Sequence, residues 1–149
     1  MEIKLSIVVP CYNEEAVLHD FYREITKVLT EDMKQVKYEI IFVDDGSKDT
    51  TVEIIEDLSN RDGHVQYVSF SRNFGKGLMY ADGDYTVIMD ADLQHPPKYI
   101  PEMYQIIQSG NYDMVATRRK SRGNESKFAS FCSETFYKVM NKISGINMG

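Results

Sequence analysis

The sequence predicts an α/β domain in which helices cover both faces of a mostly parallel sheet. Short runs rich in β-branched residues alternate with longer stretches in which apolar residues recur every three or four positions. This alternation is typical of βαβ units. The 149 residues, of which 42% are hydrophobic, suffice to bury one core, so we expect residues 1–149 to form one domain.

Five strands and three amphipathic helices are expected, in alternating order. The strands are KLSIVV (4–9), YEIIFV (38–43), VQYVSF (65–70), YTVIMD (85–90) and DMVAT (113–117). The helices are expected over residues 14–29, 51–58 and 99–107, because each of these stretches has an apolar stripe at helical spacing.

Composition excludes several classes of protein. A net charge of -6, with 17 basic against 23 acidic side chains, argues against a nucleic-acid surface. Cys11 and Cys132 are far apart and outside any CxxC pair, so we expect free thiols rather than a disulfide or zinc framework. No apolar run approaches the roughly 20 residues that cross a bilayer, so the chain itself is expected to be soluble.

The unusual polar segments all follow predicted strands. In chain order they are PCYNEE, DDGSKD, SRNFGK, ADLQHPP and TRRK. The carboxyl ends of parallel strands meet at one edge of a sheet, and ligands bind in the crevice outside that edge. We therefore expect these five segments to converge on one cleft.

The segment DADLQ supplies three oxygen donors, namely Asp90, Asp92 and the amide of Gln94. Such donors suit a hard cation, Mg2+ or Mn2+, and alternating positions at a strand exit can turn two of them toward one ion. The alternative is a solvated turn, since acids favour turns. His95 is not expected to be a ligand, because oxygen sites for Mg2+ rarely recruit imidazole.

Asp44 and Asp45 form a second acidic pair, directly after the strand EIIFV. They fit a second metal pair, acceptors for a base or ribose, or a helix cap. Ser47 and Asp49 are interpreted as N-cap residues of the following helix, because Ser and Asp are preferred there.

Other α/β proteins with acidic sites fail on the order of their motifs. A receiver-type module needs its acid pair after the first strand, and a phosphatase with an aspartate nucleophile needs DxDx(T/V) there. Here the pair follows the second strand and DADLQ the fourth. The absence of GxGxxG and GxxxxGK[ST] removes the main support for Rossmann cofactor and P-loop sites.

Taken together, the motifs SIVVPCYNEE, IIFVDDGSKDTT, FSRNFGK and VIMDADLQHPP resemble those of family 2 glycosyltransferases with the GT-A fold. The resemblance spans most of residues 3–118. It is strongest to the polyprenyl-phosphate group, which includes dolichol-phosphate mannose synthases and undecaprenyl-phosphate glucosyltransferases. DADLQHPP together with SRNFGK is specific, whereas a lone DxD is not.

The resemblance implies roles for individual residues. Asp90, Asp92 and Gln94 would hold Mg2+ or Mn2+ on the donor diphosphate, and Asp92 and Arg118 would act in catalysis. The substrate-binding positions would be Pro10, Tyr12, Glu14, Asp44, Asp45, Lys76, Asp90, Arg118 and Arg119. Of these, Pro10, Tyr12, Glu14 and Asp44 would line the base pocket, and Asp45 would stand on the ribose side.

The implied reaction is metal-dependent, inverting transfer of a hexose from a nucleotide sugar to a polyprenyl phosphate. UDP-glucose is the first choice of donor and GDP-mannose the second. A growing saccharide as acceptor, or an inactive metal- or nucleotide-binding module, is the alternative. The basic cluster RRKSR (118–122) would cover the acceptor phosphate, unless it is a solvated loop.

The partners implied are the donor, the lipid acceptor and a membrane surface, with no nucleic acid; a homo-oligomer stays open. The full-length protein would work at the cytoplasmic face of the cell membrane. An apolar helix expected over residues 128–143, with interspersed lysines, would lie at a membrane interface or pack on another part of the protein.

Two features depart from the family pattern. Family members continue for about as long again beyond the position of Gly149, so we expect a C-terminally truncated chain that is inactive as given. In addition, NFGK is followed by only GLMYAD before GDY, and a crossover usually takes at least about 10 to 12 residues. This predicts a missing stretch between Lys76 and Gly83, which an intact mass equal to that of the sequence would exclude.

Overall fold

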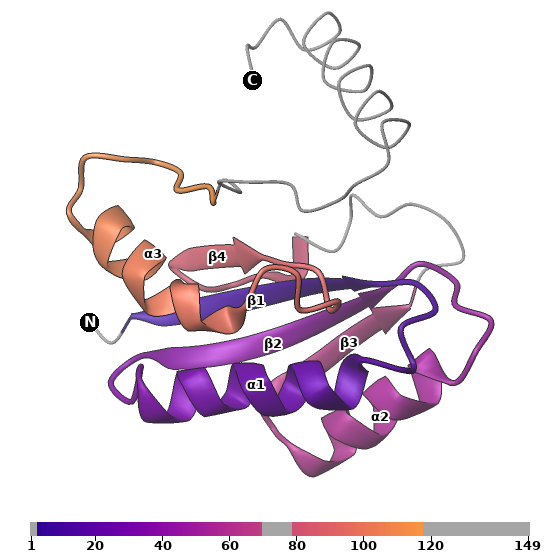
Figure 1. Ribbon diagram of the computed structural model, residues 1–149. Helices are drawn as coiled ribbons and strands as arrows, with labels where there is room; N and C mark the ends of the chain where they lie inside the picture. The colour runs from indigo at the N-terminus through magenta and orange to yellow at the C-terminus, as the bar shows by residue number, and fades with distance from the viewer. Residues whose placement is uncertain (1–2, 70–78, 118–149) are drawn as a thin grey trace, which may run out of the picture. The chain divides into compact units, whose positions relative to one another are not determined.

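The computed structural model describes residues 3–69 and 79–117 of the chain (Figure 1). The chain divides into two compact units, Met1–Val115 and Ala116–Gly149, and the helices and strands described below belong to the first. The single domain expected over residues 1–149 stays a prediction. Within the described residues, no helix is both long and apolar enough to cross a bilayer.

Four parallel strands form the sheet. They are β1 (Lys4–Cys11), β2 (Lys37–Asp44), β3 (Val65–Ser69) and β4 (Tyr85–Ile88), in the spatial order β3-β2-β1-β4. Every strand pair within the sheet is parallel. The two central strands are buried along most of their length, as parallel strands covered by helices should be. The predicted α/β class with a parallel sheet is confirmed.

Three α-helices pack on one face of this sheet (Figure 1). They are α1 (Leu18–Glu31), α2 (Thr51–Arg61) and α3 (Ile100–Gln108), the last preceded by the 3-10 turn η2 (Pro97–Tyr99). Phe21 of α1 meets Phe42 of β2 edge to face, with ring centroids 6.3 Å apart. The buried side chains of this core are Leu5, Ile7, Val9, Cys11, Leu18, Phe21, Ile25, Leu29, Met33, Ile40, Phe42, Ile55, Leu58, Val65, Met89, Ala91 and Ile100.

The opposite face has a smaller cluster to which no described helix contributes. Val8, Ile41 and Val43 are its buried members, and Val68 and Ala81 pack against it. Helices were expected on both faces, whereas every described helix lies on the first. Ala81 belongs to the β3–β4 connection, so this connection crosses the second face. The missing stretch expected within it stays a prediction, because residues 70–78 lie outside the described part.

The helix boundaries differ from the predictions at both ends. α1 begins at Leu18 rather than at residue 14, because the N–H groups of Glu14 and Glu15 bond to side chains of another loop. α2 continues to Arg61, and α3 begins at Ile100 after the 3-10 turn.

The fifth strand, expected over residues 113–117, is wrong. None of these residues is in a strand, and the Met114 side chain is 79% exposed. The run has only three consecutive apolar residues, and a strand needs a neighbouring strand to satisfy its backbone N–H and C=O groups. The helix expected over 128–143 lies outside the described residues.

Candidate functional site

The ends of β1, β2 and β4 place the predicted segments at one edge of the sheet. Cys11 at the end of β1 is in register with Asp44 at the end of β2, and the N–H of Asp45 continues this pairing to the carbonyl of Cys11 at 3.0 Å. Beyond β4, the N–H of Met89 bonds to the carbonyl of Val8 at 3.2 Å. The predicted convergence is therefore confirmed for the segments after β1, β2 and β4.

Two loops at this edge, residues 12–15 and 44–51, are joined by hydrogen bonds, and we call them the paired loops. The N–H of Asn13 donates to Oγ of Ser47 at 2.9 Å, and the N–H of Lys48 donates to Oδ1 of Asn13 at 2.8 Å. Asn13 has a φ of 54°, a conformation that Asn tolerates better than most residues. Ser47 therefore braces the other loop, and its predicted role as an N-cap is wrong.

Further bonds tie the paired loops together. The N–H of Glu14 donates to Oγ1 of the buried Thr51 at 2.8 Å. Oε2 of Glu15 accepts from the N–H and the hydroxyl of Thr50, at 3.0 and 2.7 Å. Asp49 accepts from the N–H of Thr51 at 3.0 Å, as a capping side chain does, and from the N–H of Glu15 at 3.3 Å. The bracing partners were not predicted, although both loops are rich in short polar side chains that favour such bonds.

Asp44 is held inside this arrangement. It is 2% exposed. Its carboxylate accepts hydrogen bonds from the N–H of Gly46 at 3.0 Å, the N–H of Ser47 at 3.1 Å and the Ser69 hydroxyl at 3.1 Å. A carboxylate offers about four acceptor positions, so these three donors leave room for about one more. Asp44 thus fixes its own turn, and its contact with a base stays a prediction.

Three other predicted site residues are more accessible at this edge. Tyr12 is 53% exposed, and Pro10 and Asp45 are half-buried. Within the part of the chain that the structure describes, the Asp45 carboxylate has no hydrogen bond or ion pair. The aromatic ring and this carboxylate are therefore available to a ligand, while Asp44 shapes the loop beneath them.

Residues 90–95 after β4 form a turn that we call the acidic turn. Asp90, Asp92 and Gln94 are exposed, whereas Ala91 between them is fully buried. The N–H of Gln94 donates to Oδ1 of Asp92 at 2.9 Å, and Leu93 has a φ of 58°. Asp92 thus forms the local turn considered as the alternative to a metal site. Its second oxygen and the Asp90 carboxylate face no such bond among the described residues.

Electrostatics place Glu14 of the paired loops near the acidic turn. Desolvation raises the pKa of Glu14 above its ordinary value, and the negative charges of Asp92, Asp90 and Asp49 raise it further. The opposite holds at Asp49. Although desolvation opposes it, the hydrogen bonds from Thr51 and Glu15 lower the pKa of Asp49. The acids of the two segments therefore repel one another across this edge, and a cation between them would relieve that repulsion.

The donor set of the acidic turn fits a hard cation that keeps other ligands of its own. Within the described residues, no group of three or more His, Cys, Asp or Glu side chains is arranged to hold a metal ion. Asp90 and Asp92 alone contribute two carboxylates, and Gln94 adds an amide. Mg2+ is commonly bound by one or two carboxylates, several waters and substrate phosphates rather than by an all-protein cage.

The remaining predicted site residues cannot be placed. Lys76 lies in residues 70–78, and Arg118 and Arg119 lie in residues 118–149, all outside the described residues. The same holds for the rest of the basic cluster, Lys120 and Arg122. Their roles stay predictions.

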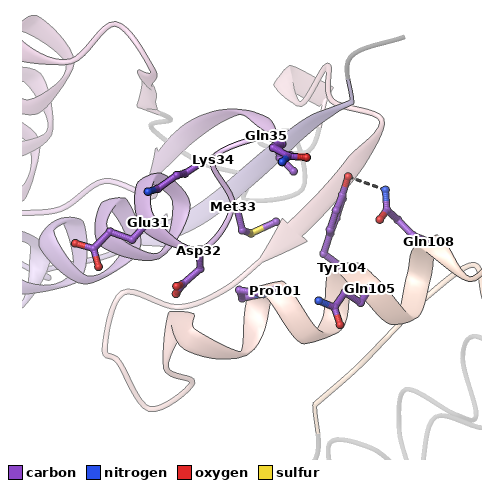
Figure 2. Close-up of a pocket in the computed structure, with 10 residues that line it drawn as sticks. Glu31, Asp32, Met33, Lys34, Gln35, Pro101, Tyr104, Gln105 and Gln108 are labelled. Atoms are coloured by element: carbon purple, nitrogen blue, oxygen red, sulfur yellow. Dashed lines mark hydrogen bonds between the residues drawn. The ribbon is translucent and has the colours of Figure 1, made fainter.

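A pocket of about 410 Å3 lies away from these segments (Figure 2). The end of α1 and the residues leading into β2 form one wall, and α3 forms the other, where Nε2 of Gln108 donates to the Tyr104 hydroxyl at 2.7 Å. Because these residues precede β2, the pocket lies toward the amino ends of the strands. It contains none of the predicted site residues, so the candidate site is an open surface at the other edge.

Comparison with known proteins was made by sequence and by structure. A family model described as "Glycosyl transferase family 2" matches residues 6–147. The uncharacterized glycosyltransferase YkcC of Bacillus subtilis (strain 168) is 40% identical over 152 residues, covering 98% of this chain and 46% of that protein. The bactoprenol glucosyl transferase of Shigella phage SfV is 40% identical over 148 residues, covering 95% and 47%. The chain thus spans about half the length of these relatives.

Solved structures share the fold. Glucosyl-3-phosphoglycerate synthase from Mycobacterium tuberculosis, in complex with Mn2+, UDP and phosphoglyceric acid, is 26% identical with a TM-score of 0.54, covering 73% of this chain and 40% of that one. The mannosyltransferase PcManGT from Pyrobaculum calidifontis, in complex with GDP-Man and Mn2+, has a TM-score of 0.61 at 20% identity, covering 80% and 36%. The second likeness concerns the fold alone. The predicted GT-A fold is confirmed.

Proposed function

Because the chain belongs to glycosyl transferase family 2, we propose that it is the nucleotide-sugar-binding part of a metal-dependent, inverting glycosyltransferase. The whole protein would transfer a hexose to a polyprenyl phosphate. The activity is assigned to the whole protein because the relatives are about twice as long as this chain.

The gathering of Glu14, Asp90 and Asp92 at the carboxyl edge of the sheet carries this proposal. Mutual repulsion of these acids raises the pKa of Glu14, beyond what desolvation does, and this favours binding of a cation. Asp90, Asp92 and Gln94 would hold Mg2+ or Mn2+, and Asp92 would thereby act in catalysis. When bound, the ion would neutralise charge on the leaving diphosphate as the bond to the sugar breaks.

The paired loops would bind the nucleoside. Tyr12, with half of its side chain exposed, would contact the base, and Pro10 and Glu14 would complete the base pocket with Asp44 beneath. Asp45 would accept a hydrogen bond on the ribose side. Because Asp44 already has three donors, we expect it to contribute one further acceptor position at most.

Glucose from UDP-glucose is the proposed donor sugar and mannose from GDP-mannose the second choice. Two relatives support the first: one is named as a glucosyl transferase, and a structural neighbour holds UDP. The word bactoprenol in the name of the phage enzyme supports a polyprenyl phosphate acceptor. A growing saccharide as acceptor, or a module that binds without transfer, is the alternative.

The acceptor chemistry needs little from a base. A lipid monophosphate with a second pKa of about 6 is largely ionised at neutral pH, so the protein has to position it and offset its charge. Lys76, Arg118 and Arg119 are proposed for contacts with phosphate groups. A site at the cytoplasmic face of a membrane follows from this acceptor and belongs to the same proposal.

Calorimetric titration with UDP and with GDP, each with and without Mn2+, tests the proposal. We expect binding of one nucleotide to strengthen by at least about tenfold with Mn2+, and the Asp92→Ala variant to lose that gain. Asp113→Ala is the matched control, because Asp113 is equally exposed but lies outside the acidic turn. Binding of neither nucleotide would refute the donor site, and unchanged Mn2+ dependence in Asp92→Ala would remove Asp92 from the metal site.

A further inference from the structure

A buried carboxylate lies at the opposite edge of the sheet from the candidate site. Glu39, near the start of β2, is 3% exposed. Its Oε1 accepts from the Ser6 hydroxyl at 2.5 Å and from the N–H of Asp82 at 3.3 Å. Its Oε2 accepts from Nζ of Lys4 at 2.9 Å and from Nε2 of Gln66 at 3.1 Å. A charge this deeply buried is tolerated only when it is paired and hydrogen-bonded, and all four acceptor positions of Glu39 are filled.

The four donors connect Glu39 to every other strand. Lys4 and Ser6 lie on β1, Gln66 lies on β3, and Asp82 lies in the connection that leads into β4. Lys4 also forms an ion pair with Asp82. The carboxylate therefore fixes the point at which the chain enters β4 against the two central strands.

The chain comes exceptionally close to β1 at this point. The N–H of Gly83 donates to Oγ of Ser6 at 2.9 Å. A Cβ atom at Gly83 would lie 2.6 Å from that oxygen, 2.8 Å from the backbone nitrogen of Ser6 and 2.9 Å from the carbonyl oxygen of Lys4. One residue later, Oδ2 of Asp84 accepts from the N–H of Lys4 at 2.9 Å. The entry into β4 is thus fixed by contacts that a displaced strand would lose.

β4 depends on such an anchor more than the other strands do. It is four residues long and pairs with β1 alone among the described strands, from Leu5 with Tyr85 to Val8 with Ile88. A shift of one residue in a strand turns each side chain to the other face. Beyond β4, Ala91 is fully buried between the exposed Asp90 and Asp92, so such a shift would move both carboxylates away from the edge.

We propose that Glu39 is a positioning residue that sets the alignment of β4 and, through it, the placement of Asp90 and Asp92 at the other end of the strand. The proposal rests on the metal site of the proposed function, because its consequence is measured there. Glu39 touches no part of that site and acts through Ser6, Asp82 and Gly83.

The Glu39→Gln variant tests this, because it keeps the volume but places an amide group against the donors of Lys4 and Gln66. We expect it to bind Mn2+ about tenfold more weakly than the wild type, as supporting residues of metal ligands commonly do. In the metal-free protein we also expect the backbone amide NMR signals of residues 90–94 to shift. Ser6→Ala, which removes the acceptor of Gly83 and a donor to Glu39, is the second variant if Glu39→Gln does not fold.

Leu58→Ala is the control for a general loss of stability. Leu58 is a buried residue of α2 that does not contact β4 through this network. We expect it to lower the Tm at least as much as Glu39→Gln while the Mn2+ affinity and the amide signals of residues 90–94 stay at wild-type values. A folded Glu39→Gln or Ser6→Ala variant with both readouts unchanged would overturn the proposal, as would equal losses in Leu58→Ala. If the wild type binds no Mn2+, the metal site fails, and the amide signals still decide the role of Glu39.

Discussion

The paired loops and the acidic turn lie at the same edge of the sheet but are held in different ways. Six hydrogen bonds connect residues 12–15 with residues 47–51, and Asp44 and Thr51 are buried among them. In the acidic turn, both aspartates are exposed, and one side-chain hydrogen bond, from Gln94 to Asp92, is identified. We infer that the proposed nucleoside side is formed before a ligand arrives, whereas the proposed metal side is completed by the ion and the diphosphate.

Replacing Asp44 should give the largest effect on stability. Asp44→Ala leaves the N–H groups of Gly46 and Ser47 and the Ser69 hydroxyl without their acceptor in a buried position. Hydrogen bonds to charged groups are worth about 1.5–3 kcal/mol each and are not additive, so we expect a loss of about 2–4 kcal/mol in the free energy of unfolding. Urea denaturation measures this loss.

Asp45→Ala is the matched control, since Asp45 is the neighbouring acid and its side chain is half-buried. We expect it to change the free energy of unfolding by less than about 0.5 kcal/mol, as most substitutions away from buried partners do. Equal losses in the two variants would contradict the distinction between an acid that builds the loop and an acid that faces a ligand.

Removing one bond between the paired loops should have an intermediate effect. Thr51→Val keeps the shape of a fully buried side chain but removes the acceptor for the N–H of Glu14. We expect a loss of about 1–2 kcal/mol in the free energy of unfolding, the cost of leaving a donor unpaired. In Thr50→Val the lost bond is exposed, so a loss below about 0.5 kcal/mol is expected. If Thr50→Val costs as much as Thr51→Val, burial does not set the strength of the brace.

The position of the acids could be predicted from the sequence, but their roles could not. The carboxyl ends of parallel strands lie at one edge, so the apolar runs before Asp44 and Asp90 were enough to place both at that edge. The burial of Asp44 depends on Ser69, which lies in another strand. In the same way, Ser47 bonds to Asn13 across the loops instead of capping its own helix, and local preferences do not predict such a long-range contact.

The failed fifth strand shows the same limit in the opposite direction. The residues DMVAT have suitable strand propensities, yet strand formation is decided by a partner that supplies backbone hydrogen bonds. Glu39 shows it as well, since a glutamate at the start of an apolar strand gives no local sign that Ser6, Gln66 and Asp82 will surround it.

The smallest expected effect is the pH dependence of stability that Glu14 gives the metal-free protein. Desolvation, followed by the charges of Asp92 and Asp90, raises the pKa of Glu14 above its ordinary value of 4.5. Between 4.5 and the raised pKa, the folded protein holds a proton that the unfolded chain has released. The free energy of unfolding should therefore decrease as the pH rises through this window.

Urea denaturation at closely spaced pH values above 4.5, in the presence of a chelator, measures that slope. Glu14→Gln should remove the contribution of Glu14, because glutamine does not titrate, while the contribution of Asp49, whose pKa is lowered, is confined to pH values below 3.8. Added Mn2+ should also flatten the slope in the wild type, since its positive charge favours the ionised form of Glu14. An identical slope in the wild type and Glu14→Gln would mean that the acids of the paired loops and of the acidic turn do not interact, and the two regions would then have to be treated as independent sites.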